Sequence, residues 1–281
     1  MTPENTTPRS DRLHTAINPS DMHRFGGKTV LVTGSTRGIG EGIARRFADE
    51  DANVVVTGRS SADGQAVADD IQNCGATATF IEADLADIEP IERLVTRTVN
   101  QFGSIDVLVN NAAAWTHGPF LDRTVDDWET VINVSLRAPW LLSKHAIDSM
   151  PAGGSIVNIS SVHSMASDPQ RFPYNVAKAG LNGMTRSMAA DLGPLNITVN
   201  AILPGPVQIK DDPGDDPLLE HRLEGLPADR YGRPADIAGM TAFLASKEAR
   251  FVTGASIPVD GGWTACLHDD PDVYGTRHSV D

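Results

Sequence analysis

The chain has 281 residues, of which 40% are apolar, and it carries a formal net charge of −14. This length fits one large α/β domain or two small ones. So acidic a surface is a poor partner for nucleic acid or an anionic membrane, and no apolar run approaches the roughly 20 residues of a membrane span.

Residues 1–24 are polar, contain three prolines and lack the apolar centre of a secretory signal. We therefore expect a mobile N-terminal arm and a cytoplasmic protein. Cys74 and Cys266 are the only cysteines, and no CxxC pair or Cys/His cluster accompanies them. This predicts no metal site and two free thiols in a reducing compartment, with a single disulfide as the alternative.

Short β-branched runs alternate with helical stretches along the chain. Strands are predicted at 28–33, 53–57, 77–83, 105–110, 155–160, 197–202 and 255–260. Helices are predicted at 38–50, 61–73, 88–101, 124–149, from Pro173 onward, and at 234–246. Such repeated βαβ units with near-continuous apolar strands predict an α/β fold: a single Rossmann-type, doubly wound parallel sheet with helices on both faces. We place this domain at 25–263 and a tail at 264–281.

The segment 205–232 interrupts the pattern with four prolines and a run of aspartates. It follows a strand end, where open α/β sheets bind ligands. A long loop at such a place is typical of a functional lid, and we expect its acids to repel polyanionic substrates.

"TGSTRGIG" at 33–40 connects the first strand to the first helix. Gly34 permits a tight turn, and Gly38 and Gly40 allow the backbone to approach a ligand closely. The helix N-terminus then offers unpaired N–H groups to an anion. This arrangement predicts a site for nucleotide phosphates.

"PYNVAK" at 173–178 places Tyr174 and Lys178 one helical turn apart, and so on one helix face. By itself this spacing also describes an ordinary surface pair, in which a lysine lies along a half-exposed ring. The rest of the chain decides between the two interpretations.

Several motifs occur in a fixed order: the glycine-rich turn, "NNAA" at 110–113, Asn133, Ser161 before "YNVAK", and "PG" at 204–205. Together they resemble the short-chain dehydrogenase/reductase family, in particular glucose dehydrogenases and 3-oxoacyl-carrier-protein reductases. The resemblance extends over about 26–263. It implies an NAD(P)-dependent oxidoreductase that interconverts a secondary alcohol and a ketone by hydride transfer.

The resemblance also implies catalytic roles. Tyr174 matches the general acid/base, and Lys178 is expected to lower the pKa of this phenol and to reach the nicotinamide ribose. Ser161 matches the serine that bonds the substrate oxygen, with its neighbour Ser160 as the competing candidate. Asn133 matches the asparagine that holds a water molecule in the proton relay.

A second set matches the family's cofactor contacts. It comprises Gly34, Ser35, Thr36, Arg37, Gly38, Ile39, Gly40, Arg59, Asp84, Leu85, Asn110, Ala112, Tyr174, Lys178, Pro204, Gly205 and Val207. Two positions depart from the family pattern. Ala113 replaces a glycine, and Ile209 replaces the threonine that bonds the nicotinamide carboxamide.

The choice of cofactor depends on the end of the second strand. Family members that prefer NAD usually carry an acid there for the ribose 2′-hydroxyl, but this chain has Gly58. Arg59 follows it, and Arg37 lies in the glycine-rich turn. Two guanidinium groups suit a 2′-phosphate, which favours NADP. If both arginines are merely solvated, NAD also serves.

We expect the substrate pocket to contain Trp115 and His117, the segment with His163 and Arg171, and the lid, beside Ser161 and Tyr174. A cation at Arg171 favours a sugar or a sugar acid. A 3-oxoacyl thioester or a simple ketone is the alternative substrate. A catalytically silent nucleotide sensor on the same fold is an alternative of another class, although such a protein would lack the tyrosine or the lysine.

Family members are usually dimers or tetramers, joined by helices equivalent to 124–149 and 173–191. We therefore expect a homodimer or homotetramer. The last residues contain few helix formers, and we expect an extended tail. This tail either frays in solvent or docks across a subunit boundary near a neighbour's active site, with apolar contacts from Trp263, Leu267 and Tyr274.

Overall fold

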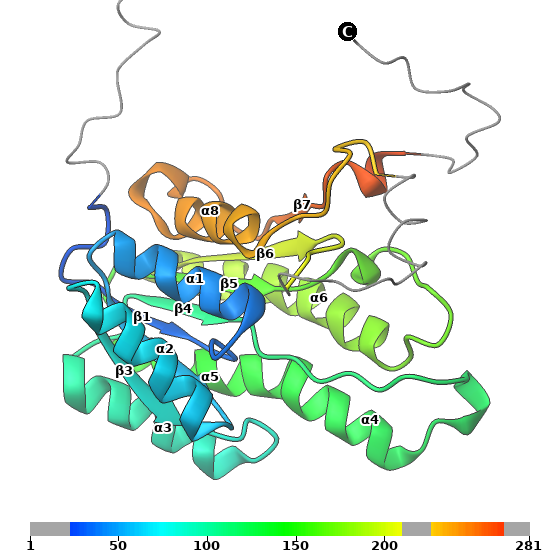
Figure 1. The fold of residues 1–281 in the computed structure, drawn as a ribbon, viewed down its shortest axis with the longest axis horizontal. Coiled ribbons are helices and arrows are strands. Elements are labelled where there is room, and N and C mark those ends of the chain that lie inside the picture. Colours follow the sequence, from blue (N-terminus) through cyan, green and yellow to red (C-terminus); the bar gives the residue numbers. More distant parts are fainter. Residues whose placement is uncertain (1–22, 210–225, 267–281) are drawn as a thin grey trace, which may run out of the picture.

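A computed structural model describes residues 23–209 and 226–266. Seven parallel strands form one sheet in the order β3-β2-β1-β4-β5-β6-β7 (Figure 1). They are β1 (Thr29–Val32), β2 (Asn53–Gly58), β3 (Thr77–Glu82), β4 (Val107–Asn110), β5 (Ser155–Ile159), β6 (Thr198–Pro204) and β7 (Ser256–Val259). The seven predicted strands and the doubly wound sheet are confirmed. The strand order reverses between β1 and β4, which is where such sheets bind ligands.

Helices cover both faces of the sheet (Figure 1). One face carries α1 (Gly38–Asp49), α2 (Ser61–Asn73) and α8 (Pro234–Ala245), and the other carries α3 (Ile88–Phe102), α5 (Ala138–Ala146) and α6 (Tyr174–Leu192). Val30 and Val32 of β1 pack in the first layer, and Leu31 packs in the second. Most strand positions are apolar because successive side chains enter different cores.

The region 124–149 is less regular than the single helix predicted there. It comprises α4 (Val125–Ile132), a π-helical turn η4 (Asn133–Arg137), α5 and a 3-10 turn η5 (Ile147–Ser149). The carbonyl of Asn133 accepts its bond from the N–H of Ala138, five residues on. Pro139 explains the change of pattern, because it has no N–H to donate to the carbonyl of Ser135 four residues earlier.

Helix α6 begins at Tyr174, with Pro173 as its N-cap and not as its first helical residue. Tyr174 thus stands in the first turn, at the carboxyl end of the sheet. Lys178 follows one turn deeper and is buried.

The two ends of the predicted lid meet. Val207 forms an isolated parallel bridge with Gly232, and the N–H of Gln208 donates to the carbonyl of Gly232 over 2.9 Å. Residues 210–225, which include the predicted acids, lie outside the described residues, as do the N-terminal arm up to 22 and the tail from 267. Among the helices of the described parts, none has the length and apolarity needed to cross a membrane.

Candidate active site

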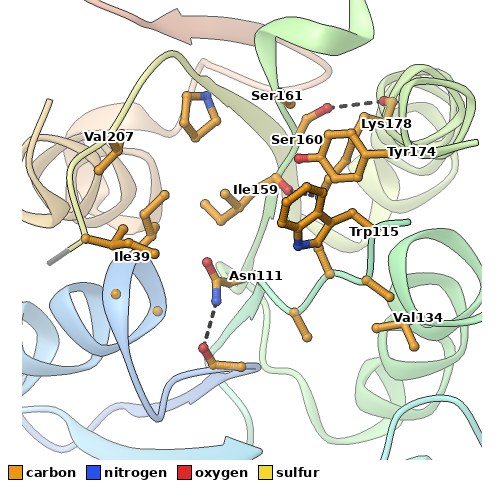
Figure 2. Close-up of a pocket in the computed structure, with 18 of the residues that line it drawn as sticks. Ile39, Asn111, Trp115, Val134, Ile159, Ser160, Ser161, Tyr174, Lys178 and Val207 are labelled. Atoms are coloured by element: carbon orange, nitrogen blue, oxygen red, sulfur yellow. Dashed lines mark hydrogen bonds between the residues drawn. The ribbon is translucent and has the colours of Figure 1, made fainter. Parts of the chain in front are cut away.

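A cleft of about 990 Å³ opens at the carboxyl ends of the strands. Both predicted sets of residues contribute to it. From the cofactor set it contains Gly34, Thr36, Arg37, Gly38, Ile39, Gly40, Arg59, Asp84, Leu85, Ala112, Pro204, Gly205 and Val207. From the catalytic and substrate sets it contains Trp115, Ser161, His163, Arg171, Tyr174 and Lys178. Figure 2 shows Tyr174, Ser161 and Lys178 gathered at one end, with Ile39 and Val207 across the cleft.

The glycine-rich turn is packed without spare room. Gly34 and Gly38 have φ angles of +62° and +59°, which favour glycine. A Cβ on Gly40 would overlap the carbonyl oxygen of Gly34 and the side-chain amide of Asn111. Helix α1 has Arg37 as its N-cap, and that side chain makes no capping hydrogen bond. The first-turn N–H groups are therefore available to an anion, so the turn fits dinucleotide phosphates.

Two residues of the cofactor set face away from the cleft. Ser35 is fully buried, and its hydroxyl donates to the carbonyl of Val32 over 2.6 Å. Asn110 is also buried, and its amide donates to Asn158 over 2.9 Å. Neither belongs to the cleft lining, and a cofactor contact through either residue stays a prediction. Both side chains instead join strands and helices in the interior.

The next residue, Asn111, faces the cleft. It lines the cleft, and its side-chain amide donates to the carbonyls of Thr33 and Gly34 over 2.8 and 3.0 Å. These bonds fix the glycine-rich turn against the end of β4. The signal was present in "NNAA", because consecutive residues at a strand end point to opposite faces.

Arg37 and Arg59 line the cleft together with Asp84 and Leu85, at the end where the family resemblance implies the adenosine of the cofactor. Ile209, the departure from the family pattern, also lines the cleft, and its side chain lies against Gly38 of the phosphate turn. It provides an apolar contact where the family has a hydroxyl.

The catalytic candidates are interlocked at the other end. Lys178 is 2% exposed, and its Nζ donates to the carbonyl of Ile159 over 2.7 Å. This Nζ lies 5.6 Å from the centre of the Tyr174 ring. The Ser160 hydroxyl donates to the backbone carbonyl of Lys178 over 3.1 Å (Figure 2), whereas Ser161 is hydrogen-bonded to Tyr174. The geometry thus favours Ser161 over Ser160 as the partner of the tyrosine.

Burial raises the pKa of Tyr174, and it outweighs the hydrogen bond of Ser161 and the charge of Arg171, which act in the opposite direction. Burial lowers the pKa of Lys178 to about 8. Lys178 is not among the groups that lower the tyrosine pKa in the chain alone, which differs from the expectation for this pair. A protonated tyrosine at neutral pH is suited to donate a proton to a carbonyl oxygen.

Asn133 lies behind the cleft wall. It is partly buried and does not belong to the cleft lining, whereas Thr130 and Val134 of the same helical segment do. Its backbone carbonyl is engaged in the π turn. A role for Asn133 through a bound water stays a prediction.

The substrate side carries aromatic and cationic groups. The guanidinium carbon of Arg171 lies 5.3 Å from the Trp115 ring centre. The rings of His163 and Tyr174 are 6.4 Å apart, and Nε2 of His163 lies 3.7 Å from Asp168 Oδ2. His117 contacts the edge of Trp115 but does not line the cleft.

Trp263 is one of the residues expected to contact a neighbouring subunit. It lines the cleft of its own chain and packs against Val162, Ala201 and Leu203. Trp263 is thus a wall of this chain's own cleft, and its contact to a neighbouring subunit stays a prediction. Leu267 and Tyr274 lie outside the described residues.

A family model described as "Enoyl-(Acyl carrier protein) reductase" matches residues 34–264. The chain belongs to the short-chain dehydrogenase/reductase family. It is an oxidoreductase of that family, with NAD or NADP as the redox partner.

Individual relatives are similar over nearly their whole length. A trans-4-hydroxycyclohexanecarboxylate dehydrogenase from Sinomonas cyclohexanicum is 38% identical over 86% of this chain and 95% of its own. An L-rhamnose 1-dehydrogenase (NAD(P)(+)) from Azotobacter vinelandii is 39% identical over 84% of this chain and 96% of its own. A blue fluorescent protein from a metagenomic library, solved with NADPH, has a TM-score of 0.82 and 39% identity over 85% of this chain and 99% of that one.

Proposed function

We propose that the enzyme oxidises a secondary hydroxyl of a sugar, or of a sugar acid with one carboxylate, and that it prefers NADP to NAD. Arg171 carries this proposal. Arg171 lines the cleft with its guanidinium over the Trp115 ring, three residues before Tyr174, where the helix begins. A guanidinium at this position suits a single carboxylate or several hydroxyls on the substrate.

The nicotinamide cofactor supplies the hydride acceptor or donor when it is bound. The chain's own groups handle the proton and the geometry. Ser161 and Tyr174 bond the substrate oxygen, Tyr174 exchanges the proton, and Lys178 holds a positive charge below the phenol. Indole faces at Trp115 and Trp263 exclude water and accept the apolar face of a ring.

Two relatives support the substrate class. One acts on L-rhamnose by its description, and the other on a hydroxylated six-membered ring with a carboxylate. The family model's description names an acyl-carrier-protein substrate, which favours an acyl thioester as the second candidate. For the cofactor, Arg37 and Arg59 in the cleft, with Gly58 where an acid would select NAD, support NADP.

The test is a substrate panel followed by NADPH absorbance, with wild type, Arg171→Ala and Arg171→Lys. The panel contains sugars, sugar acids, cyclic hydroxy acids and a 3-oxoacyl thioester. We expect Arg171→Ala to raise KM selectively for the acids, and Arg171→Lys to retain part of the acid preference because it keeps the charge. Equal KM of all three proteins on every acid would contradict carboxylate recognition. Turnover of only the thioester would replace the sugar proposal.

The same panel run with both cofactors tests the nucleotide preference. We expect a higher kcat/KM with NADP, and Arg59→Asp should reverse the order because a carboxylate repels the 2′-phosphate. A tenfold preference of the wild type for NAD would show that the two arginines do not determine the choice.

We also propose a homodimer or homotetramer assembled through the helices of 124–149 and α6. Trp140 on α5 and Val176 on α6 are 49% and 42% exposed in the single chain. Light scattering should give a mass of two or four chains, and Trp140→Glu should lower it. A monomer at micromolar concentration would contradict the proposal.

A further inference from the structure

We propose that Thr36 is a specificity-determining residue for the nicotinamide nucleotide, because its methyl group occupies the space that a side chain at position 58 needs. The inference deepens the proposed NADP preference and rests on it. The two guanidinium groups attract a 2′-phosphate, and Thr36 acts differently, by keeping position 58 a glycine.

The contact between the two residues is direct. A Cβ added to Gly58 would lie 2.6 Å from Cγ2 of Thr36 and 3.4 Å from its Oγ1. The first separation is far inside van der Waals contact, and an aspartate would bring three further heavy atoms into the same region. The Cβ of Thr36 itself lies 3.6 Å away, an ordinary contact. The obstacle is therefore the methyl group and not the backbone.

The two segments cannot easily move apart. The N–H of Ser35 donates to the carbonyl of Thr57 over 3.0 Å, and the N–H of Thr57 donates to the hydroxyl of Ser35 over 3.0 Å. The carbonyl of Gly58 also accepts from the N–H of Ala83 over 3.1 Å. The two reciprocal bonds join Ser35 to Thr57, the residues directly before Thr36 and Gly58. Ser35 and Thr57 are both buried, so loosening the pair would leave buried polar groups unsatisfied.

The position matters because of what lies beside it. Thr36, Gly58, Arg37 and Arg59 all line the adenosine end of the cleft. An acid at the end of the second strand is the group that bonds a ribose 2′-hydroxyl. With Thr36 in place, that group has no room at the end of the second strand, and Arg37 and Arg59 remain beside it.

The test is a double-mutant cycle of Gly58→Asp and Thr36→Ala, with Thr36→Ser/Gly58→Asp as the matched control that removes only the methyl group. Two quantities are measured for each protein: the dissociation constants of NADH and NADPH by fluorescence titration, and the urea midpoint without nucleotide. We expect Gly58→Asp alone to lower the urea midpoint and to weaken both nucleotides. Adding Thr36→Ala should restore the midpoint and tighten NADH at least tenfold relative to Gly58→Asp alone, while NADPH stays weak. The serine control should behave like the alanine pair.

If Gly58→Asp fails to fold, Gly58→Ala with and without Thr36→Ala measures the same contact through the urea midpoint. Additive midpoints in that cycle, or NADH bound by Gly58→Asp alone as tightly as by the pair, would overturn the inference. A wild type that prefers NADH would instead contradict the proposed NADP preference, whereas the coupling between positions 36 and 58 is measured independently of it.

Discussion

The two ends of the cleft are constructed differently. At the nucleotide end, backbone and short side chains are joined across strands: Ser35 to Thr57, and Asn111 to the carbonyl of Gly34. At the substrate end, long side chains on loops hold one another through ring contacts, as Arg171 does with Trp115.

A second ring cluster supports the substrate end from outside the cleft. Phe172 lies 5.0 Å from Phe120 and 5.7 Å from Trp128, measured between ring centres. It joins the loop before α6 to the 3-10 turn Phe120–Asp122 and to helix α4. At the nucleotide end, one carbon atom added to Gly40 or Gly58 would overlap its neighbours, whereas the substrate end is held together by contacts between side chains.

The largest expected effect is on the chemical step itself and not on the packing at either end of the cleft. Tyr174→Phe removes the group that exchanges a proton with the substrate oxygen and should lower kcat by roughly 10²–10⁴, the usual range for an acid–base group. The dissociation constant of NADPH should change little, because the phosphate turn is untouched. Single-turnover kinetics and fluorescence titration check the two parts. A variant with near-normal kcat would remove Tyr174 from the catalytic assignment.

The rigidity of the nucleotide end predicts the second effect. Gly40→Ala adds a Cβ that overlaps the carbonyl of Gly34. Overpacking of this kind costs about 1–3 kcal/mol, so we expect a lower urea midpoint and a clearly weaker NADPH complex. Gly239→Ala in α8 is the control, because a Cβ there meets only the guanidinium of Arg46 at 3.9 Å. Equal midpoints of the two variants would show that the turn yields more easily than its packing indicates.

Lys178 is buried, and its lowered pKa of about 8 predicts that the free energy of unfolding depends on pH. The unfolded chain keeps this lysine protonated up to about pH 10.4, so between pH 8 and that value the unfolded state binds more protons. The free energy of unfolding contributed by Lys178 should therefore rise with pH from about 8 and be lowest below it. Urea unfolding of wild type and Lys178→Met at pH 7, 8 and 9.5 measures this difference. If the two proteins keep a constant difference over that range, the lysine titrates normally.

The smallest effect tests the substrate end. Phe172→Ala removes two aromatic pairs, each worth about 1 kcal/mol. We expect a higher KM for the substrate, an unchanged NADPH dissociation constant and a small loss of stability. Phe251→Ala is the matched control, since Phe251 is fully exposed in the chain. A selective change in NADPH binding instead would mean that the two ends are not mechanically separate.

Local patterns in the sequence were sufficient for much of this molecule. The apolar runs predicted all seven strands, because strands buried on both faces need no polar alternation. The glycine-rich turn and the Tyr174/Lys178 pair were found by spacing, because a helical turn places residues four apart on one face. The interruption at Asn133 was missed, although Pro139 is its local cause.

What spacing could not decide is which way a side chain faces and how much water surrounds it. Ser35 and Asn110 turn inward while Asn111 lines the cleft, a choice made by partners such as Thr57 and Asn158 far along the chain. Trp263 reaches its own cleft because β7 lies beside β6 at the sheet edge. The raised pKa of Tyr174 likewise follows from burial, and burial is a property of the assembled layers and not of any short stretch of sequence.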